Sequence, residues 1–212
     1  MNKLLKIMMI IMLALCMIIT ITGCGNKEVD NNQEAKEEKR EFSMGEWKDN
    51  VYENDFLGFK FTIPDGWNRL TEEEIAEEME LAKELVSDLQ KLSLEASKLQ
   101  NAYFLVASDE KTGENIRIIS EKPLIDATTE DYIDAVKSGL KEAETIKYEE
   151  VGVTKEKVGN IDCDVLTEKG SYLGVSILQK YYIYKVDDYF ITIIVTTSSD
   201  ESRINEIMNN FQ

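Results

Sequence analysis

The stretch that decides the fold is residues 172–197, which read YLGVSILQKYYIYKV-DD-YFITIIVTT. Two runs rich in β-branched and aromatic side chains, residues 172–186 and 189–197, flank the polar pair Asp187-Asp188. Such runs favour β-strands, and a two-residue polar break between them is typical of a hairpin turn. The stretch therefore predicts two long neighbouring strands in an antiparallel sheet.

Shorter runs on both sides of this hairpin extend the sheet. Strands are predicted at residues 51–52, 57–63, 102–107, 116–120, 146–153 and 161–166. Turn residues separate several of them, at Lys111-Thr112-Gly113, Gly159-Asn160 and Lys169-Gly170. Because consecutive strands joined by short turns pair antiparallel, the sheet is predicted to be mostly antiparallel.

Three segments have the apolar spacing of amphipathic helices, at residues 71–99, 129–143 and 200–211. Thr71 and Glu74 open the first with the spacing of a capping box. A stripe of leucine, methionine and other apolar side chains follows over residues 75–99 and is interpreted as core, with docking of part of it against a partner helix left open. Helices packed on an antiparallel sheet define the predicted fold class, α+β.

The N-terminus has the pattern of a secretion signal. Lys3 and Lys6 precede an uninterrupted apolar run at residues 7–21. As a helix, this run is about 22 Å long at about 1.5 Å per residue, which is short of a bilayer core of about 30 Å and suits a signal peptide.

The run ends in Ile21-Thr22-Gly23-Cys24, which resembles the lipobox of bacterial lipoproteins. The resemblance implies signal-peptidase recognition of Ile21, Thr22 and Gly23, cleavage before Cys24, and lipidation of its thiol. Two acyl chains give stable anchoring where one is marginal. The expected location is the extracytoplasmic face of the cell membrane. The alternative is an uncleaved signal anchor in which Cys24 is an ordinary thiol.

The sequence pattern divides the chain into three parts. Residues 1–23 are the predicted signal peptide, and residues 24–46 are the lipidated cysteine and a disordered tether with dense charge and few apolar side chains. Residues 47–212 are predicted to form a single extracytoplasmic domain, long enough to bury a core without disulfides.

The line YENDFLGFKFTIPDGW at residues 52–67 resembles the opening of PsbP-like and Mog-like domains, where a strand ends in Pro-x-Gly-Trp before a helix. The run of hairpins followed by a last helix also resembles that family. The resemblance covers about residues 50–212 and implies an α/β/α sandwich with an antiparallel sheet. The fold is known for binding roles and no shared catalytic site, so no functional residue carries over.

Composition excludes several functions. Without residues 1–23 the chain keeps 22 basic and 41 acidic side chains, a balance of −19. This balance argues against nucleic acid, whose phosphates need lysine and arginine, and leaves a basic protein partner open. Histidine is absent, which removes imidazole-based nucleophile pairs and zinc sites. We therefore expect no enzyme activity, no cofactor and no metal.

Several groups of side chains could form sites, but each also has a structural interpretation. Acidic clusters occur at residues 72–80, at Asp162 and Asp164, at Asp187-Asp188 and at Asp200-Glu201. They are interpreted as solvated charge; calcium binding, a basic partner and a carboxylate pair for glycoside hydrolysis are the sharper alternatives. Cys163, the one cysteine left outside the leader and the lipobox, is expected on an apolar face as a buried thiol.

Aromatic side chains raise one more possibility. Tyrosines gather in the hairpin region at positions 172, 181, 182, 184 and 189. They are interpreted as cross-strand packing, with a ligand groove as the alternative. Trp67 is interpreted as a core side chain at the strand-to-helix turn.

The function predicted from the sequence is that of a membrane-anchored, non-catalytic binding or accessory module for a protein or envelope component. One alternative is a solute- or lipid-binding lipoprotein with an internal pocket. A second alternative is an enzyme that uses carboxylates alone.

Overall fold

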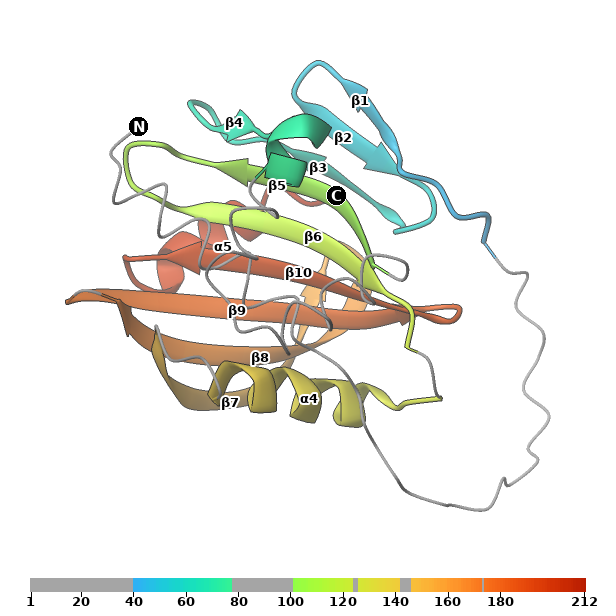
Figure 1. Cartoon of the computed structure of the whole chain (residues 1–212). Helices are drawn as coiled ribbons and strands as arrows, with labels where there is room; N and C mark the ends of the chain where they lie inside the picture. The colour runs from blue at the N-terminus through green and yellow to red at the C-terminus, as the bar shows by residue number, and fades with distance from the viewer. Residues whose placement is uncertain (1–39, 78–100, 124–125, 142–145, 173) are drawn as a thin grey trace.

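The computed structural model describes residues 40–77, 101–123, 126–141, 146–172 and 174–212. A seven-stranded antiparallel sheet dominates them (Figure 1), with strands in the spatial order β4 (Asn68–Arg69), β5 (Asn101–Ser108), β6 (Asn115–Glu121), β10 (Tyr189–Thr197), β9 (Val175–Val186), β8 (Ile161–Tyr172) and β7 (Lys147–Val158). A smaller antiparallel sheet consists of β1 (Glu46–Lys48), β2 (Val51–Asn54) and β3 (Phe59–Thr62). The helices within these residues are α4 (Thr129–Lys141), α5 (Glu201–Met208) and a short turn of helix at residues 72–77. The predicted class, α+β with a mostly antiparallel sheet, is confirmed.

The hairpin of β9 and β10 forms the centre of the large sheet. Tyr189 pairs with Val186, and Asp187 in the turn has φ of 50°, a left-handed conformation that aspartate tolerates better than most residues. Alternate side chains of β10 enter two different cores, with Ile193 on one face and Ile194 on the other. Because both faces of β10 are buried, its sequence does not alternate between apolar and polar side chains.

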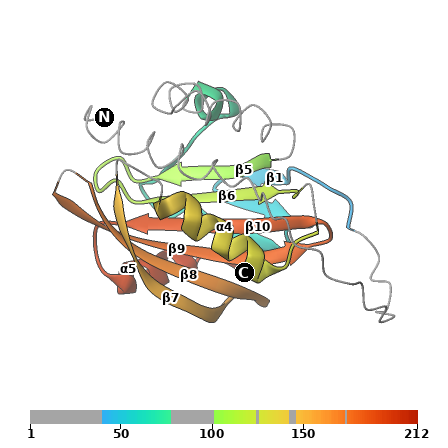
Figure 2. The same cartoon turned by 60° about the horizontal axis from the view of Figure 1, so that its bottom comes forward.

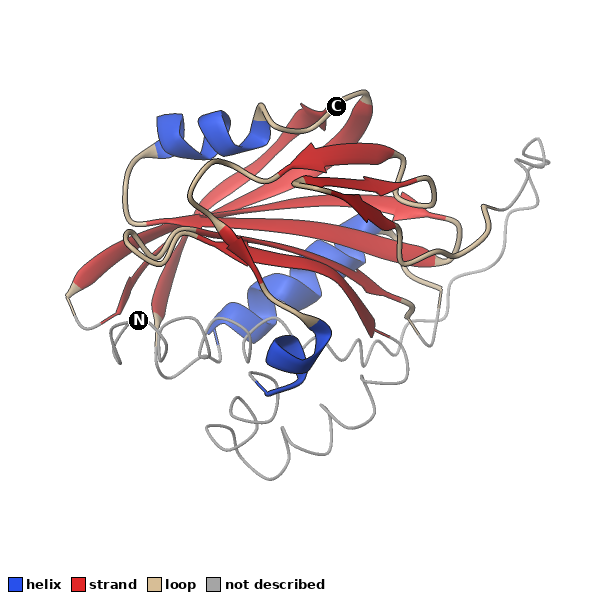
Figure 3. Ribbon diagram, turned by 90° about the horizontal axis from the view of Figure 1, so that it is seen from above, coloured by secondary structure: helices blue, strands red, loops and turns tan. Residues whose placement is uncertain are grey.

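The two faces are covered differently, and Figure 3 shows α4 and α5 on opposite sides of the sheet. On one face, α4 buries Tyr132, Val136 and Leu140 while it carries the chain from β6 to the far edge strand β7 (Figure 2). The other face carries α5 and the small sheet. There the large sheet shares a core with side chains such as Ile204 of α5 and Phe61 of β3.

One predicted turn is wrong. Lys169 and Gly170 lie inside β8, where Gly170 pairs with both Tyr148 and Ile177. The chain turns instead between Tyr172 and Val175, and Gly174 has φ of 83° there. The glycine at 170 serves packing, because a Cβ there would lie 2.9 Å from Ile146 Cγ2 and 3.1 Å from Tyr148 Cδ1.

Among the described residues, contacts with the domain already occur at Arg40, seven residues before the domain start expected at residue 47. The Arg40 backbone N–H donates to Asp187 Oδ2 at 3.1 Å, and its guanidinium donates to the Phe56 carbonyl oxygen. Phe42 packs its ring on Phe56 and Tyr189, with ring centroids 5.1 and 5.5 Å apart. Residues 40–46 of the predicted tether therefore lie against the folded domain, beside the turn between β9 and β10.

Several predictions fall outside the described residues. These are the signal peptide, the Ile21-Thr22-Gly23-Cys24 motif, most of the tether, and the part of the apolar stripe after residue 77. The capping box at the start of that helix is confirmed, since the Thr71 N–H donates to Glu74 Oε2 at 2.8 Å and the Glu74 N–H donates to Thr71 Oγ1 at 3.2 Å. Among the described helices, none has the length and apolar character needed to cross a membrane.

Candidate functional site

A groove of about 780 Å³ lies at one end of the large sheet, on the face that carries α5. Strands β7, β8 and β9 supply most of its lining, and the connection from β10 into α5 supplies the opposite wall. Lys169 is paired with Leu178, and Ser171 with Ser176. Leu178 belongs to the core on the α5 face, so these side chains line that same face of the sheet.

The edge strand β7 is shaped by a bulge beside the groove. The register against β8 shifts between Glu150 and Gly152, and Gly152 has φ of 150°. Bulges place one extra residue on one strand and redirect its side chains. Here the extra residue is Val151, which lines the groove and is 54% exposed. Val153, two residues on, pairs with Leu166, a residue of the core on the α4 face.

The opposite wall is the beginning of α5. Asp200 is the N-cap, and its carboxylate accepts a hydrogen bond from the Ser202 backbone N–H at 3.0 Å. Hydrogen bonds from the Ser202 side chain and backbone lower the pKa of Asp200. An N-cap of this kind satisfies a free N–H of the first turn and fixes where the helix begins. Asp200 and Glu201 are thereby held at the rim of the groove.

Lys180 fixes α5 to the sheet beside the groove. The side chain is 3% exposed, and its ammonium lies 2.8 Å from Glu156 and 2.6 Å from Glu201. Burial lowers the pKa of Lys180, but the two carboxylates outweigh burial and the net shift is upward. Lys180 is therefore charged and occupied by its own two carboxylates.

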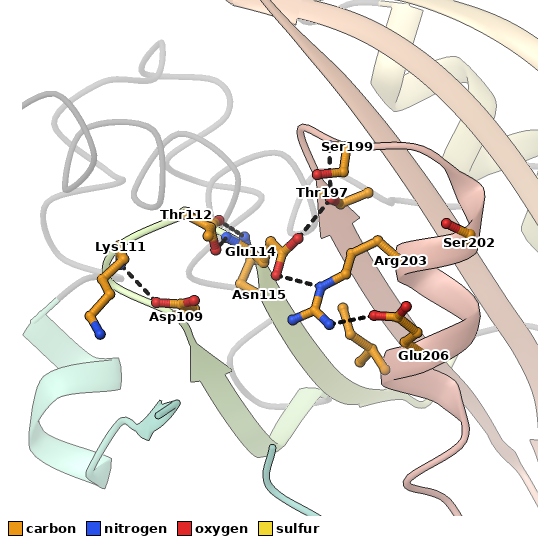
Figure 4. Close-up of polar contacts among 12 residues, drawn as sticks. Asp109, Lys111, Thr112, Glu114, Asn115, Thr197, Ser199, Ser202, Arg203 and Glu206 are labelled. Atoms are coloured by element: carbon orange, nitrogen blue, oxygen red, sulfur yellow. Dashed lines mark hydrogen bonds and ion pairs between the residues drawn. The ribbon is translucent and has the colours of Figure 1, made fainter. Parts of the chain in front are cut away.

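A second ionic contact holds α5 from the side of β6, as Figure 4 shows. The carboxylate of Glu114, 3% exposed, accepts from Arg203 Nε at 2.9 Å and from Thr197 Oγ1 at 3.1 Å. Arg203 also pairs with Glu206 at 2.7 Å. Buried charges need partners of this kind, and together the two contacts position the helix that walls the groove.

Three other charged side chains line the groove and differ from Lys180 and Glu114 in being exposed. Lys147 and Lys169 line the groove and are exposed, as is Glu149, and none of the three makes an ion pair in the described part of the chain. The lysines farther along β7 are paired, Lys155 with Asp164 at 2.7 Å and Lys157 with Asp162 at 2.9 Å. Within the described residues, the groove therefore holds two lysines that make no ion pair, although Glu149 is the residue directly opposite Lys169 on the β7–β8 ladder.

The structure assigns most of the side chains singled out in the sequence to structural roles. Cys163 is 2% exposed, and burial raises the pKa of its thiol to about 12, as expected for an inert buried cysteine. Trp67 lies in the core on the α5 face. Asp162 and Asp164 are bound by lysines, and no cluster of metal-ligating side chains occurs within residues 40–77, 101–123, 126–141, 146–172 and 174–212.

The tyrosines do not line one cavity. Tyr181 packs in the core on the α4 face, whereas Tyr182 and Tyr184 pack in the core on the α5 face. Tyr184 donates to the Leu57 carbonyl oxygen at 3.1 Å, and burial raises its pKa. Cross-face and cross-strand packing accounts for these three side chains.

Sequence reasoning singled out Asp200-Glu201 as an acidic cluster but missed the groove that these two residues line and most of its other residues. Lys147, Lys169 and Ser199 stand in three different segments, and no motif connects them. The alternation of Lys147, Glu149 and Val151 along one predicted strand was the available signal. Local sequence pattern does not encode the bulge in β7 or the register between β7 and β8. These two features place that strand beside Lys169.

Comparisons with known proteins do not assign the chain to a family. No protein-family model matches it, and no curated protein matches it in sequence. Solved structures of similar fold include the solution structure of cyanobacterial PsbP from Synechocystis sp. PCC 6803, with 14% identity, TM-score 0.47, and 76% of this chain and 90% of that chain covered.

Two further solved structures are similar. The crystal structure of LpqN, described as involved in cell envelope biogenesis of Mycobacterium tuberculosis, has 13% identity, TM-score 0.41, and coverage of 73% of this chain and 82% of that one. A structure from Bacteroides thetaiotaomicron VPI-5482 has 13% identity and TM-score 0.40, and the alignment covers 77% of this chain and 47% of that one. Likenesses at this level say nothing about what the groove binds.

Proposed function

We propose that this chain is a lipid-tethered, extracytoplasmic, non-catalytic module that binds a protein or another envelope component in the groove between β7, β8 and the start of α5. The observation that carries the proposal is the position of the groove relative to the tether. Arg40 and Phe42 join the domain beside the turn between β9 and β10, and the groove lies at the opposite end of β9.

The distance between these two points follows from strand geometry. Val186 stands next to the turn, and Ser176 lines the groove ten residues earlier on β9. At about 3.3 Å per residue, the two ends are about 33 Å apart. A domain held to lipid through Cys24 and residues 25–39 would thus present the groove away from its attachment point.

The groove's own chemistry supports binding rather than catalysis. General acid catalysis needs a carboxyl group whose pKa is raised towards the working pH. The pKa of Asp200 is lowered because its carboxylate caps α5. Glu201 is bound to Lys180 at 2.6 Å. Two of the three groove carboxylates are therefore committed to holding the helix.

The groove can be tested with two valines that form a matched pair. A photo-crosslinking amino acid is placed at Val151 in one variant and at Val153 in the other, in cells that make the full-length chain. Val151 is in the groove and Val153, 42% exposed, pairs with Leu166 on the other face. We expect a distinct crosslinked product from position 151 and none from position 153. Equal crosslinking from both positions, or none from 151, would contradict the proposal.

A further inference from the structure

Two groove lysines make no ion pair with any other described residue, and they lie close together. Lys147 pairs with Ser171 across the β7–β8 ladder, and Lys169 is the position two residues earlier on β8. Diagonal neighbours of this kind on one sheet face lie about 7–8 Å apart, with their Cβ atoms somewhat closer. Glu149 stands directly opposite Lys169 on this ladder but makes no ion pair with it, so both ammonium groups can donate charge-assisted hydrogen bonds to a bound anion, and the Glu149 carboxylate beside them can accept from a hydroxyl.

Hydroxyl groups surround this lysine pair. Thr167, Ser171 and Ser176 line the sheet side of the groove, and Ser199 lines the wall formed by the start of α5. Hydroxyls both donate and accept hydrogen bonds, so they suit a ligand that carries hydroxyl groups of its own. Val151 and Leu178 add apolar surface between the polar groups.

The groove carboxylates decide between two kinds of anionic ligand. Glu149, Asp200 and Glu201 line the same groove as the two lysines. The ionised side chains of an acidic peptide carry only acceptors, so only its backbone N–H groups could donate to those carboxylates. A polymer that carries both anionic groups and hydroxyls can place its anions at the lysines and donate from its hydroxyls to the carboxylates.

We propose that the groove binds a hydroxyl-rich anionic polymer, a polyol or glycan chain that carries phosphate or carboxylate groups, with its anions between Lys147 and Lys169. This inference rests on the groove being the binding site of the proposed function, and it names the ligand class. The distal position of the groove, about 33 Å along β9 from the tether contact, suits a polymer that lies outside the membrane.

The test uses the mature-length chain and poly(glycerol phosphate) as the probe, with affinity measured by calorimetry at low ionic strength. The variant Lys147→Gln/Lys169→Gln is expected to bind the probe at least about tenfold more weakly, because two hydrogen bonds between charged partners are lost. The matched control is Lys155→Gln/Lys157→Gln, which removes two exposed lysines from β7 outside the groove and leaves the affinity unchanged.

Two further probes of matched length, neutral dextran and poly-L-glutamate, separate the parts of the inference. The proposal predicts that dextran and poly-L-glutamate both bind more weakly than poly(glycerol phosphate). Dextran binding as tight as poly(glycerol phosphate) would overturn the role of the lysines, and equally tight poly-L-glutamate would overturn the role of the hydroxyls. An equal loss of affinity in Lys147→Gln/Lys169→Gln and in Lys155→Gln/Lys157→Gln would show that the probe binds by unspecific charge attraction. That result would also overturn the proposal. If position 151 still crosslinks while the lysine variant binds the probe normally, the ligand class is wrong and the groove remains the binding site.

Discussion

Replacing Arg203 by alanine is expected to lower the free energy of unfolding by about 3 kcal/mol, the cost of leaving a buried carboxylate without its ionic partner. Glu114 is 3% exposed and accepts from Arg203 Nε at 2.9 Å. In the variant it keeps a single neutral donor, the Thr197 hydroxyl at 3.1 Å. Urea unfolding followed by circular dichroism measures the loss.

Two control variants make this result interpretable. Glu206→Gln removes the other ionic partner of Arg203. The Glu206 side chain is 63% exposed, and an exposed ion pair of this kind contributes less than about 1 kcal/mol to the free energy of unfolding. The double variant Arg203→Ala/Glu114→Gln replaces the stranded charge with a neutral amide and is expected to be more stable than Arg203→Ala alone. A loss for Arg203→Ala no larger than for Glu206→Gln would contradict the account of how α5 is held.

Cys24→Ala is expected to abolish lipidation and signal-peptide cleavage completely. By its resemblance to a lipobox, the Ile21-Thr22-Gly23-Cys24 motif needs the thiol to form the thioether that carries the acyl chains. Each buried methylene contributes about 0.8 kcal/mol, so loss of the lipid removes far more binding free energy than any surface contact supplies. Metabolic labelling with a fatty acid and electrophoresis should show an uncut, unlabelled precursor.

The matched control for that experiment is Cys163→Ala, which removes the other cysteine outside the apolar leader. Cys163 is buried in the folded domain, so its replacement should leave processing and labelling unchanged. Normal cleavage and lipid labelling of Cys24→Ala would overturn the lipoprotein assignment, and with it the argument that the groove is presented away from a lipid anchor.

The sequence predicted those parts of the fold that depend on local pattern. The β9–β10 hairpin, α4, α5 and the Thr71–Glu74 capping box follow from periodicity and turn chemistry within a few neighbouring residues. Gly170 was read wrongly because a glycine beside a lysine looks like a turn. Its role is to admit the Ile146 and Tyr148 side chains against β8, a contact between segments that local pattern does not encode.

The candidate site could not be predicted for the same reason. Its charge pattern depends on which side chains stand opposite one another across the β7–β8 ladder and on which of these opposite pairs form ion pairs. Lys155 meets Asp164 across the β7–β8 ladder after the bulge, whereas Lys147, before the bulge, meets Ser171. One inserted residue at Val151 therefore separates the bound lysines of β7 from the available one.

The measurement that tests the groove most directly is amide hydrogen exchange of the mature chain, with and without a solubilised envelope fraction. The account predicts slower exchange at residues 147–151, 169–172, 174–178 and 199–201, and unchanged exchange in α4 and around Phe42. Slower exchange confined to α4 or to the surface around Phe42, or no change anywhere, would contradict it.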